Sequence, residues 1–213
     1  MTNAGASAEF VPRSWRNRGR MPEPKRLRLA DRAAALAFAD AAGAAAWTPE
    51  VLDIGFGHGE SLLALAGELP TCRILGVEVH APGQLRAMDR IAAAGLTTVR
   101  VLPADVVALL PLLAPASLRL IQALHPDPWP KRRHAARRLF GRTVLARCVD
   151  LLGPDGVMHI VVDDDSYAAG LHTDLSALPV RPVEPPALPE TKYGRRALKA
   201  GRRVHQIAYR KAI

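Results

Sequence analysis

The segment His125–Pro130 (HPDPWP) contains the carboxylate whose setting most clearly suggests chemistry. Asp127 lies between Pro126 and Pro128, and a proline fixes its own φ and restricts the residue before it. The eight residues after the segment hold six cationic side chains and no acid: Lys131, Arg132, Arg133, His134, Arg137 and Arg138. A rigidly held carboxylate beside so much positive charge predicts a site to which a polyanion is brought.

A second set of residues with chemical potential lies in LDIGFGHGES, residues 52–61. Three glycines fall where a predicted strand turns into a predicted helix: Gly55, Gly57 and Gly59. Glycine there permits positive φ and a close approach of the backbone to a ligand. The dinucleotide fingerprint would need glycine at position 60, where the chain has Glu60, and a glutamate at a helix start disfavours a pyrophosphate. Asp53, two residues before the glycines, gives a pattern that resembles S-adenosylmethionine-dependent methyltransferases, whose cofactor carries a sulfonium and an ammonium.

Two more acids follow the next two predicted strands. Glu78 closes the second strand about 20 residues beyond the glycine turn, where nucleotide-binding sheets place a ribose-binding acid. Asp105 follows the third strand and could accept a hydrogen bond from an adenine amino group. Each acid alone could instead cap a helix or lie in a solvated loop. Three acids at consecutive strand ends favour a nucleotide-type cofactor site.

Strand-like and helix-like segments alternate along the chain, which predicts an α/β domain built on a mostly parallel sheet. Strands are predicted over residues 50–56, 73–79, 97–103, 118–126, 156–162 and 202–211. Helices are predicted over residues 33–46, 60–69, 81–95 and 105–113, and from Lys131 towards Leu152. We expect residues 1–28 to form a flexible basic arm, residues 29–213 to form one domain, and residues 179–190 to be an extended Pro-rich connector.

The net charge of +9 is unevenly distributed. Residues 13–28, 131–142 and 192–211 hold 21 of the 29 Lys and Arg residues and a single acid, Glu23. Basic clusters without counter-charges predict a surface that binds phosphates. The alternative is that the source proteome is rich in arginine and places it on every protein surface, without a specific role.

The sequence also suggests a compartment. The N-terminus lacks an apolar signal segment, and the longest uncharged run is too short for a membrane helix. Cys72 and Cys148 have no metal-site spacing and are expected to be reduced thiols. We expect a cytoplasmic protein with no metal and no membrane partner.

Several motifs together resemble the bacterial tRNA (guanine-N7-)-methyltransferase family: LDIGFGHGESLL, GVEVHAPG, HPDPWPKRRHAARR, DDDSYA and TKYGRR. The N-terminal RSWRNRGRM is similar to the basic leader of that family, so the resemblance covers nearly the whole chain. The most specific element is the PDPWxKxRHxxRR pattern, because many methyltransferases share the glycine turn. The resemblance implies a Rossmann-like class I methyltransferase fold, with a mostly parallel seven-stranded sheet and helices on both faces.

The resemblance also implies roles for individual residues. Contacts with S-adenosyl-L-methionine are implied at the glycine turn and at four acids: Asp53, Glu78, Asp105 and Asp127. Asp127 also occupies the proposed active-site position. Substrate tRNA contacts are implied at Lys131, Asp163, Thr191, Lys192, Tyr193 and Gly194. The implied reaction methylates N7 of guanine 46 in the tRNA variable loop, with tRNA as the partner and a monomer or weak homodimer as the assembly.

The chain departs from the family pattern at five positions. These are His125 for an aromatic residue, Pro130 for His, Asp164 for Trp, Gly194 for Glu and Ala197 for Gly. Gly194 can offer only backbone contacts to a substrate.

Guanine N7 carries a free lone pair, so methylation there needs alignment rather than a base. A fixed Asp127 carboxylate could accept hydrogen bonds from guanine N1–H and the exocyclic amine, and it favours a cationic product ring. Trp129 could stack on a splayed base or pack beneath the loop. Three other classes remain as alternatives: an RNA-binding protein that has lost catalysis, a small-molecule methyltransferase, and an NAD-dependent oxidoreductase, which Glu60 disfavours.

Overall fold

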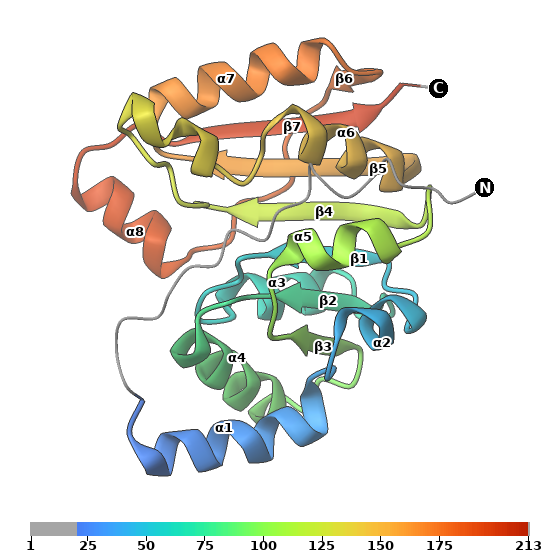
Figure 1. Ribbon diagram of the computed structural model, residues 1–213, viewed down its shortest axis with the longest axis vertical. Helices are drawn as coiled ribbons and strands as arrows, with labels where there is room; N and C mark the ends of the chain where they lie inside the picture. The colour runs from blue at the N-terminus through green and yellow to red at the C-terminus, as the bar shows by residue number, and fades with distance from the viewer. Residues whose placement is uncertain (1–20, 213) are drawn as a thin grey trace.

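The computed structural model describes residues 21–212, with the side chain of Arg132 left out. Within this range seven strands form one sheet in the order β3-β2-β1-β4-β5-β7-β6 (Figure 1). The strands are β1 (Val51–Ile54), β2 (Ile74–Val77), β3 (Val99–Leu102), β4 (Leu118–Leu124), β5 (Leu152–Val162), β6 (Val180–Pro182) and β7 (His205–Lys211). Strands β1 to β5 pair in parallel, and β7 runs antiparallel to β5 and β6. The predicted α/β class with a mostly parallel sheet is confirmed.

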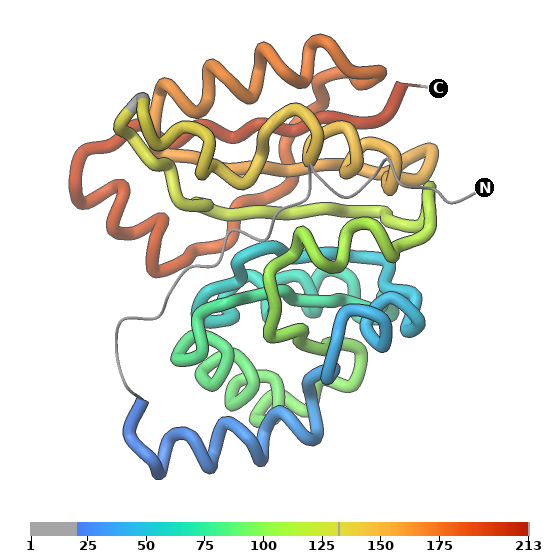
Figure 2. The backbone as a smooth tube through the Cα atoms, in the orientation of Figure 1, coloured from blue at the N-terminus to red at the C-terminus, as the bar shows by residue number. Residues whose placement is uncertain are grey.

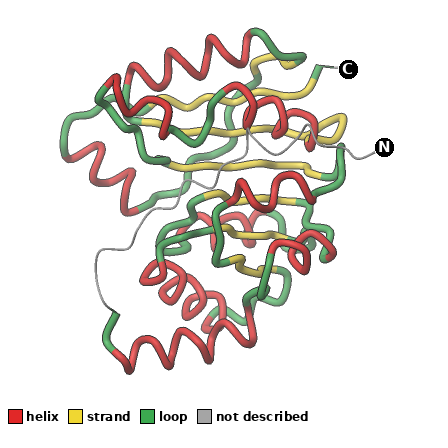
Figure 3. Tube along the Cα trace, viewed as in Figure 1, coloured by secondary structure: helices red, strands yellow, loops and turns green. Residues whose placement is uncertain are grey.

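Helices cover both faces of the sheet (Figure 3). One face packs against α2 (Ala41–Ala46), α5 (Val106–Leu109), the 3₁₀ helix η1 (Leu110–Leu112), α6 (Arg142–Leu151) and α7 (Asp165–Ser176). The other packs against α1 (Glu23–Leu36), α3 (Glu60–Glu68) and α4 (Ala81–Ala93). The described chain starts with α1 beside the β3 edge and ends in β7 near the opposite edge (Figure 2). None of the helices in residues 21–212 is long and apolar enough to cross a membrane.

Strand β1 shows why the sheet needs two apolar layers. Its four residues are all buried, and they alternate between the two cores. Val51 joins the core under α3 and α4, whereas Leu52 and Ile54 join the core under α5 and α6. Asp53 therefore points towards α3, as the one polar side chain of the strand.

The carboxyl ends of the parallel strands meet at one edge of the molecule, on the left in Figure 1. The glycine turn, the loops after β2 and β3, and the His125–Pro130 segment all follow these strand ends. Helix α8 (Lys192–Lys199) lies at the same edge. In open α/β sheets, this edge is where ligands bind.

Two predicted boundaries in the first part of the chain are wrong. Residues 23–28, assigned to the arm, form the start of α1, where Arg28 and Arg32 pair with Asp89 of α4. Residues 1–20 of the arm lie outside the described residues. The predicted helix over residues 33–46 is two helices, because Phe38 hydrogen-bonds to the Val101 carbonyl of β3 before Asp40 caps α2.

The predicted helix from Lys131 to Leu152 is also divided. A 3₁₀ helix, η2 (Arg132–Arg137), is followed by an extended break before α6 begins at Arg142. The Arg138 side chain turns back at this break to donate to the carbonyl of Pro128, 2.8 Å away. The Pro-rich connector, predicted to be extended, also contains the short strand β6.

Gly83 in α4 should resist substitution, because a Cβ there would lie 2.4 Å from the Gly57 carbonyl oxygen of the glycine turn. We expect Gly83→Ala to lower the free energy of unfolding by about 1–3 kcal/mol through overpacking. A Cβ at Gly67 of α3 would have no atom within 4 Å beyond its chain neighbours and its own helix backbone, so Gly67→Ala should stabilise the chain by about 0.5–1 kcal/mol. Urea unfolding of both variants measures this, and equal effects at the two positions would contradict the packing described.

Candidate functional site

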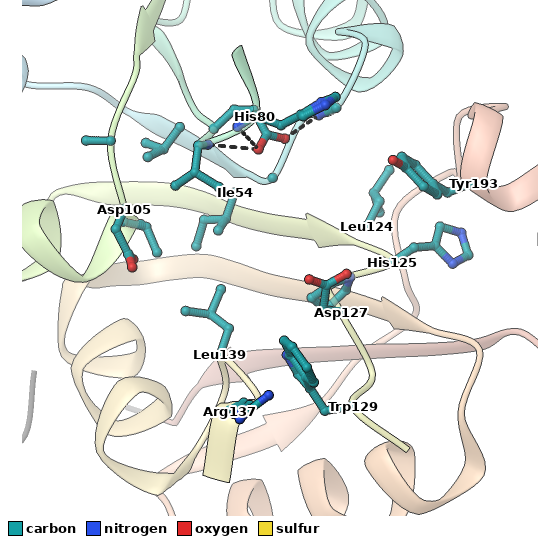
Figure 4. A pocket seen from close by; sticks show the side chains of 18 residues that line it. Ile54, His80, Asp105, Leu124, His125, Asp127, Trp129, Arg137, Leu139 and Tyr193 are labelled. Atoms are coloured by element: carbon teal, nitrogen blue, oxygen red, sulfur yellow. Dashed lines mark hydrogen bonds between the residues drawn. The ribbon is translucent and has the colours of Figure 1, made fainter. Parts of the chain in front are cut away.

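A cavity of about 780 Å³ opens at the carboxyl ends of the strands (Figure 4). Its walls come from loops that are far apart in sequence. The residues that line it are Ile54, Gly55, Gly57, Val77–His80, Ala104–Val106, Leu124–Asp127, Trp129, Arg137, Leu139 and Tyr193. Of the residues predicted as functional, the cavity brings together Gly55, Gly57, Glu78, Asp105, Asp127 and Tyr193.

The glycine turn takes the backbone conformation that the sequence indicated. Gly55, Gly57 and Gly59 have φ values of 75°, 57° and 81°, in the left-handed region that favours glycine. Gly59 does not line the cavity, since its Cα faces α4, where a Cβ would lie 2.7 Å from the Cβ of Ala87. Two of the three glycines therefore shape the cavity, and the third lets α4 approach the turn.

Glu78 links the turn to the end of β2. Its carboxylate accepts hydrogen bonds from the backbone N–H groups of Gly57 (3.0 Å), Val79 (2.8 Å) and His80 (2.9 Å). A carboxylate offers about four acceptor sites, so capacity remains for a ligand hydroxyl. Glu78 both holds the turn in place and presents a negative charge to the cavity.

Asp53 does not line the cavity. It is only 1% exposed beneath the glycine turn, where its Oδ2 accepts a 2.5 Å hydrogen bond from the Ser61 hydroxyl of α3. Gln122 lies opposite it in the register of β1 and β4, and the other oxygen, Oδ1, has no hydrogen-bond partner in the described chain. Burial raises the pKa of Asp53 to about 7, against the lowering effect of Ser61 and Gln122. Asp53 thus has no direct contact with the cavity, and it can affect a ligand there only by supporting the glycine turn and the start of α3.

Asp105 lies on the opposite side of the cavity from Asp127 (Figure 4). It is the N-cap residue of α5 and accepts a hydrogen bond from the Val107 N–H at 3.1 Å. Capping and a place on the cavity wall are compatible, because the cap occupies one carboxylate oxygen and the side chain remains at the strand end.

The backbone is strained on both sides of Asp127. His125 and Trp129 have φ values of 56° and 43°, which side chains with a Cβ rarely adopt. Each such residue costs on the order of 1–3 kcal/mol unless its surroundings stabilise it. The segment must therefore be held by contacts outside itself.

Those contacts come from β5, η2 and the break after η2. The His125 N–H donates to the Val161 carbonyl at 2.8 Å, and Arg138 donates from Nε to the carbonyl of Pro128 at 2.8 Å. The Arg137 guanidinium lies 4.9 Å from the centre of the Trp129 ring, and His134 meets that ring edge-on. Arg138 also donates to Asp164 and Ser166 at the start of α7, so three of its hydrogen bonds hold the loop and α7 together.

Asp127 points into the cavity from this loop (Figure 4). Its side chain is exposed, but the surrounding walls displace enough water for burial to raise its pKa above the ordinary 3.8. Desolvation is the cause of the shift, so the carboxylate is a poorly solvated acceptor. That is the environment in which it would interact most strongly with a donor or a cation.

The residues predicted to contact substrate fall into two groups. Lys131 is exposed just before η2, two residues after the cavity-lining Trp129, and does not itself line the cavity. Asp163 is 9% exposed and pairs with Arg202, at 2.9 Å. His125 Nδ1 lies 3.9 Å from Asp163 Oδ1, too far for a hydrogen bond, and burial lowers the pKa of this imidazole. Asp163 therefore pairs with Arg202 next to His125 and does not line the cavity.

The segment Thr191–Gly194 forms the start of α8. Thr191 caps the helix by accepting from the Gly194 N–H at 3.0 Å. The Lys192 N–H donates to Glu60 of α3 at 2.9 Å. Of the four residues, only Tyr193 lines the cavity, and it is 43% exposed.

Three functional contacts were not predicted from the sequence. They are the Arg138 contact with the Asp127 loop, the Arg202 pair with Asp163, and the Glu60 contact with α8. The only sequence signal was the absence of local counter-charges, which cannot say which distant group an arginine will meet. No cluster of three or more His, Cys, Asp or Glu side chains suited to a metal occurs among the described residues.

Comparison with protein families places the chain among methyltransferases. Residues 47–207 match the family model described as "Putative methyltransferase". A tRNA (guanine-N(7)-)-methyltransferase of Halorhodospira halophila is 39% identical over 174 residues, covering 76% of this chain and 74% of the relative. The enzyme of the same name from Nitrosomonas eutropha is 36% identical over 173 residues, covering 77% of each chain.

Solved structures agree on the fold. A 30S ribosomal A1408 methyltransferase from an uncultured bacterium superposes with a TM-score of 0.54 at 11% identity, covering 82% of this chain and 95% of that one. An O-methyltransferase from Thermotoga maritima gives a TM-score of 0.52 at 15% identity, over 93% and 68% of the two chains. The Rossmann-like methyltransferase fold is confirmed.

The buried Asp53 should make stability depend on pH. Because its folded-state pKa of about 7 lies above its usual 3.8, its contribution to stability is complete below pH 3.8 and is lost as the pH rises through 7. We expect Asp53→Asn to remove this loss, on the order of 2–4 kcal/mol between pH 4.5 and pH 8. Urea unfolding of both proteins across that range measures it. Identical pH slopes would contradict the assignment.

Proposed function

Because this chain belongs to the tRNA (guanine-N(7)-)-methyltransferase family, we propose that it transfers a methyl group from S-adenosyl-L-methionine to N7 of a guanine in tRNA. By the family resemblance, the target is guanine 46 of the variable loop. The observation that carries the proposal is the convergence of Glu78, Asp105 and Asp127 on one cavity at the strand ends. We propose the cytoplasm as its location, since that is where a bacterial tRNA would be modified.

The cavity wall suits the charge of this cofactor. Among the described side chains, three carboxylates and one guanidinium, that of Arg137, line the cavity, which favours a cationic ligand over a pyrophosphate. When bound, S-adenosyl-L-methionine supplies an electrophilic methyl group on a sulfonium. The residues proposed to hold it are Asp53 through the turn above it, Gly55, Gly57, Gly59, Glu78, Asp105 and Asp127.

Within that cavity, Glu78 would accept from ribose hydroxyls with the acceptor capacity that its three backbone donors leave. Asp105 would accept from the adenine amino group at the other side of the cavity. The positive φ of Gly55 and Gly57 leaves the turn without side chains, so a ligand can approach its backbone.

Asp127 would act on the guanine. N7 has a lone pair and no proton, so the chain needs to align the base rather than deprotonate it. Alignment of reactants can supply about 7–11 kcal/mol of barrier reduction. The Asp127 carboxylate would accept from guanine N1–H and the exocyclic amine and would stabilise the positive charge that arrives on the ring. The strained loop fixes where that carboxylate stands.

The tRNA would meet the exposed cations around the cavity. Lys131 and Arg133 are exposed at η2, and α8 carries Lys192, Arg195, Arg196 and Lys199. Phosphate contacts of this kind orient an RNA without reading its sequence. Tyr193 and the backbone of Thr191–Gly194 would contact the nucleotide nearest the cavity. Asp163 would act indirectly, through its ion pair with Arg202.

Incubation with unmodified tRNA and methyl-labelled S-adenosyl-L-methionine, followed by mapping of the labelled nucleotide, tests the proposal. We expect label at N7 of one guanine in the variable loop. In the same assay Asp127→Asn should lower kcat by about 100-fold or more, because the negative charge beside the purine is lost.

Asp155→Asn is the matched control, because Asp155 is 90% exposed and lies in β5. Its activity should equal that of the unaltered chain. Label on another atom would refute the proposed reaction, and full activity of Asp127→Asn would remove Asp127 from it.

Lys131→Ala should weaken tRNA binding and reduce the slope of log K against log salt by about 1, the value for one lost phosphate contact. Binding by the unaltered chain should itself fall steeply between roughly 50 and 200 mM salt. Arg119→Ala removes one charge at the start of β4, away from the cavity, and should leave the slope unchanged. Filter-binding titrations measure these slopes. A salt-independent affinity, or equal slopes for both variants, would count against the cationic surface.

A further inference from the structure

Glu60 connects two parts of the site that are 132 residues apart. It is the first residue of α3 and directly follows the glycine turn. Its Oε2 accepts a hydrogen bond from the backbone N–H of Lys192 at 2.9 Å. Its Oε1 lies 3.3 Å from the Arg195 guanidinium and 3.8 Å from that of Arg90. One carboxylate thus joins α3, α4 and α8.

The position suits a carboxylate for a local reason. Lys192 is the first residue of α8, and the first N–H groups of a helix have no partner within the helix. Glu60 supplies that partner, and its charge lies at the positive ends of both α3 and α8. The side chain is 19% exposed, so salt screens these contacts less than those of a surface pair.

The first turn of α8 also touches both halves of the cavity. A Cβ on Gly57 would lie 3.4 Å from the Tyr193 ring, so Tyr193 packs against the glycine turn. A Cβ on Gly194 would lie 3.5 Å from His125 Nε2, at the base of the Asp127 loop. In Figure 4 Tyr193 and His125 accordingly lie next to one another at one end of the cavity.

The surrounding charges make Glu60 difficult to replace. Arg90 also donates to the His58 carbonyl at 3.0 Å, and Arg86 approaches the His58 ring. With Arg195, these guanidinium groups bring positive charge from α4 and α8 to one corner. Without Glu60 the two helices would present like charges to each other.

We propose that Glu60 is a positioning residue that seats the first turn of α8 against the glycine turn, so that binding of cofactor and binding of tRNA favour each other. This inference rests on the proposed function, because that function assigns the first turn of α8 to tRNA. When cofactor binding orders the glycine turn, Glu60 would transmit that order to α8. When tRNA binds to α8, the same contact would order the glycine turn, because coupling between two binding sites is reciprocal.

The coupling is measured as the Kd for tRNA with and without S-adenosylhomocysteine. We expect the unaltered chain to bind tRNA about fivefold or more tightly with this cofactor product present. Glu60→Ala should reduce that ratio to nearly one and raise the KM for tRNA more than it lowers kcat. Glu60→Gln, which keeps an acceptor for the Lys192 N–H but loses the charge, should give an intermediate ratio.

Glu68→Ala is the matched control, since it removes the same side chain from the exposed far end of α3. It should leave the ratio unchanged. The double variant Glu60→Ala/Arg195→Ala should lose little more than Glu60→Ala alone, because the two residues act through one contact. A Glu60→Ala chain with the coupling ratio of the unaltered chain would overturn the inference.

Hydrogen exchange provides a readout that does not depend on activity. The α8 amides, above all that of Lys192, should exchange faster in Glu60→Ala than in Glu68→Ala, and unchanged exchange would overturn the inference. If the unaltered chain neither bound nor methylated tRNA, the proposed function would fail, and the exchange rates alone would still decide whether Glu60 seats α8.

Discussion

The site depends on a short loop that is held in an unfavourable backbone conformation on both sides of Asp127. His125 and Trp129 each precede a proline and each have positive φ, so the loop would relax if it stood alone. Arg138 at the Pro128 carbonyl and Arg137 over the Trp129 ring hold it in place. Arginines of the cationic segment after the loop therefore stabilise the loop in the absence of a ligand. The Asp127 carboxylate is held in position without a bound substrate.

The acidic side chains around the site differ in burial, and their roles differ accordingly. Asp53 is buried and supports the glycine turn from below, whereas Glu78 holds the turn from the side and also faces the cavity. Asp127 also faces the cavity, where desolvation raises its pKa. Glu60 does not line the cavity and connects the turn to α8. Carboxylates of the same kind thus have different roles, which depend on how deeply each one is buried and on which groups it contacts.

The sequence predicted the sheet, the glycine turn and the three acids that line the cavity, because these follow from local periodicity and from the rule that parallel strands end at one edge. It did not predict the break at Arg138 or the short strand β6, since each depends on a partner distant in sequence: the Pro128 carbonyl and the strand β7. Glu60 shows the limit most clearly. A glutamate at position 60 argued against a dinucleotide cofactor, but the contact of Glu60 with Lys192 could only be seen in the folded chain.

The most direct test of this account is a crystal structure of the chain with S-adenosylhomocysteine and guanosine 5′-monophosphate. We expect the ribose at Glu78, and the guanine with its N1–H and amino group directed at Asp127 and its N7 facing the sulfur. A purine bound away from Asp127, or a cofactor product bound outside the cavity of the three carboxylates, would contradict it.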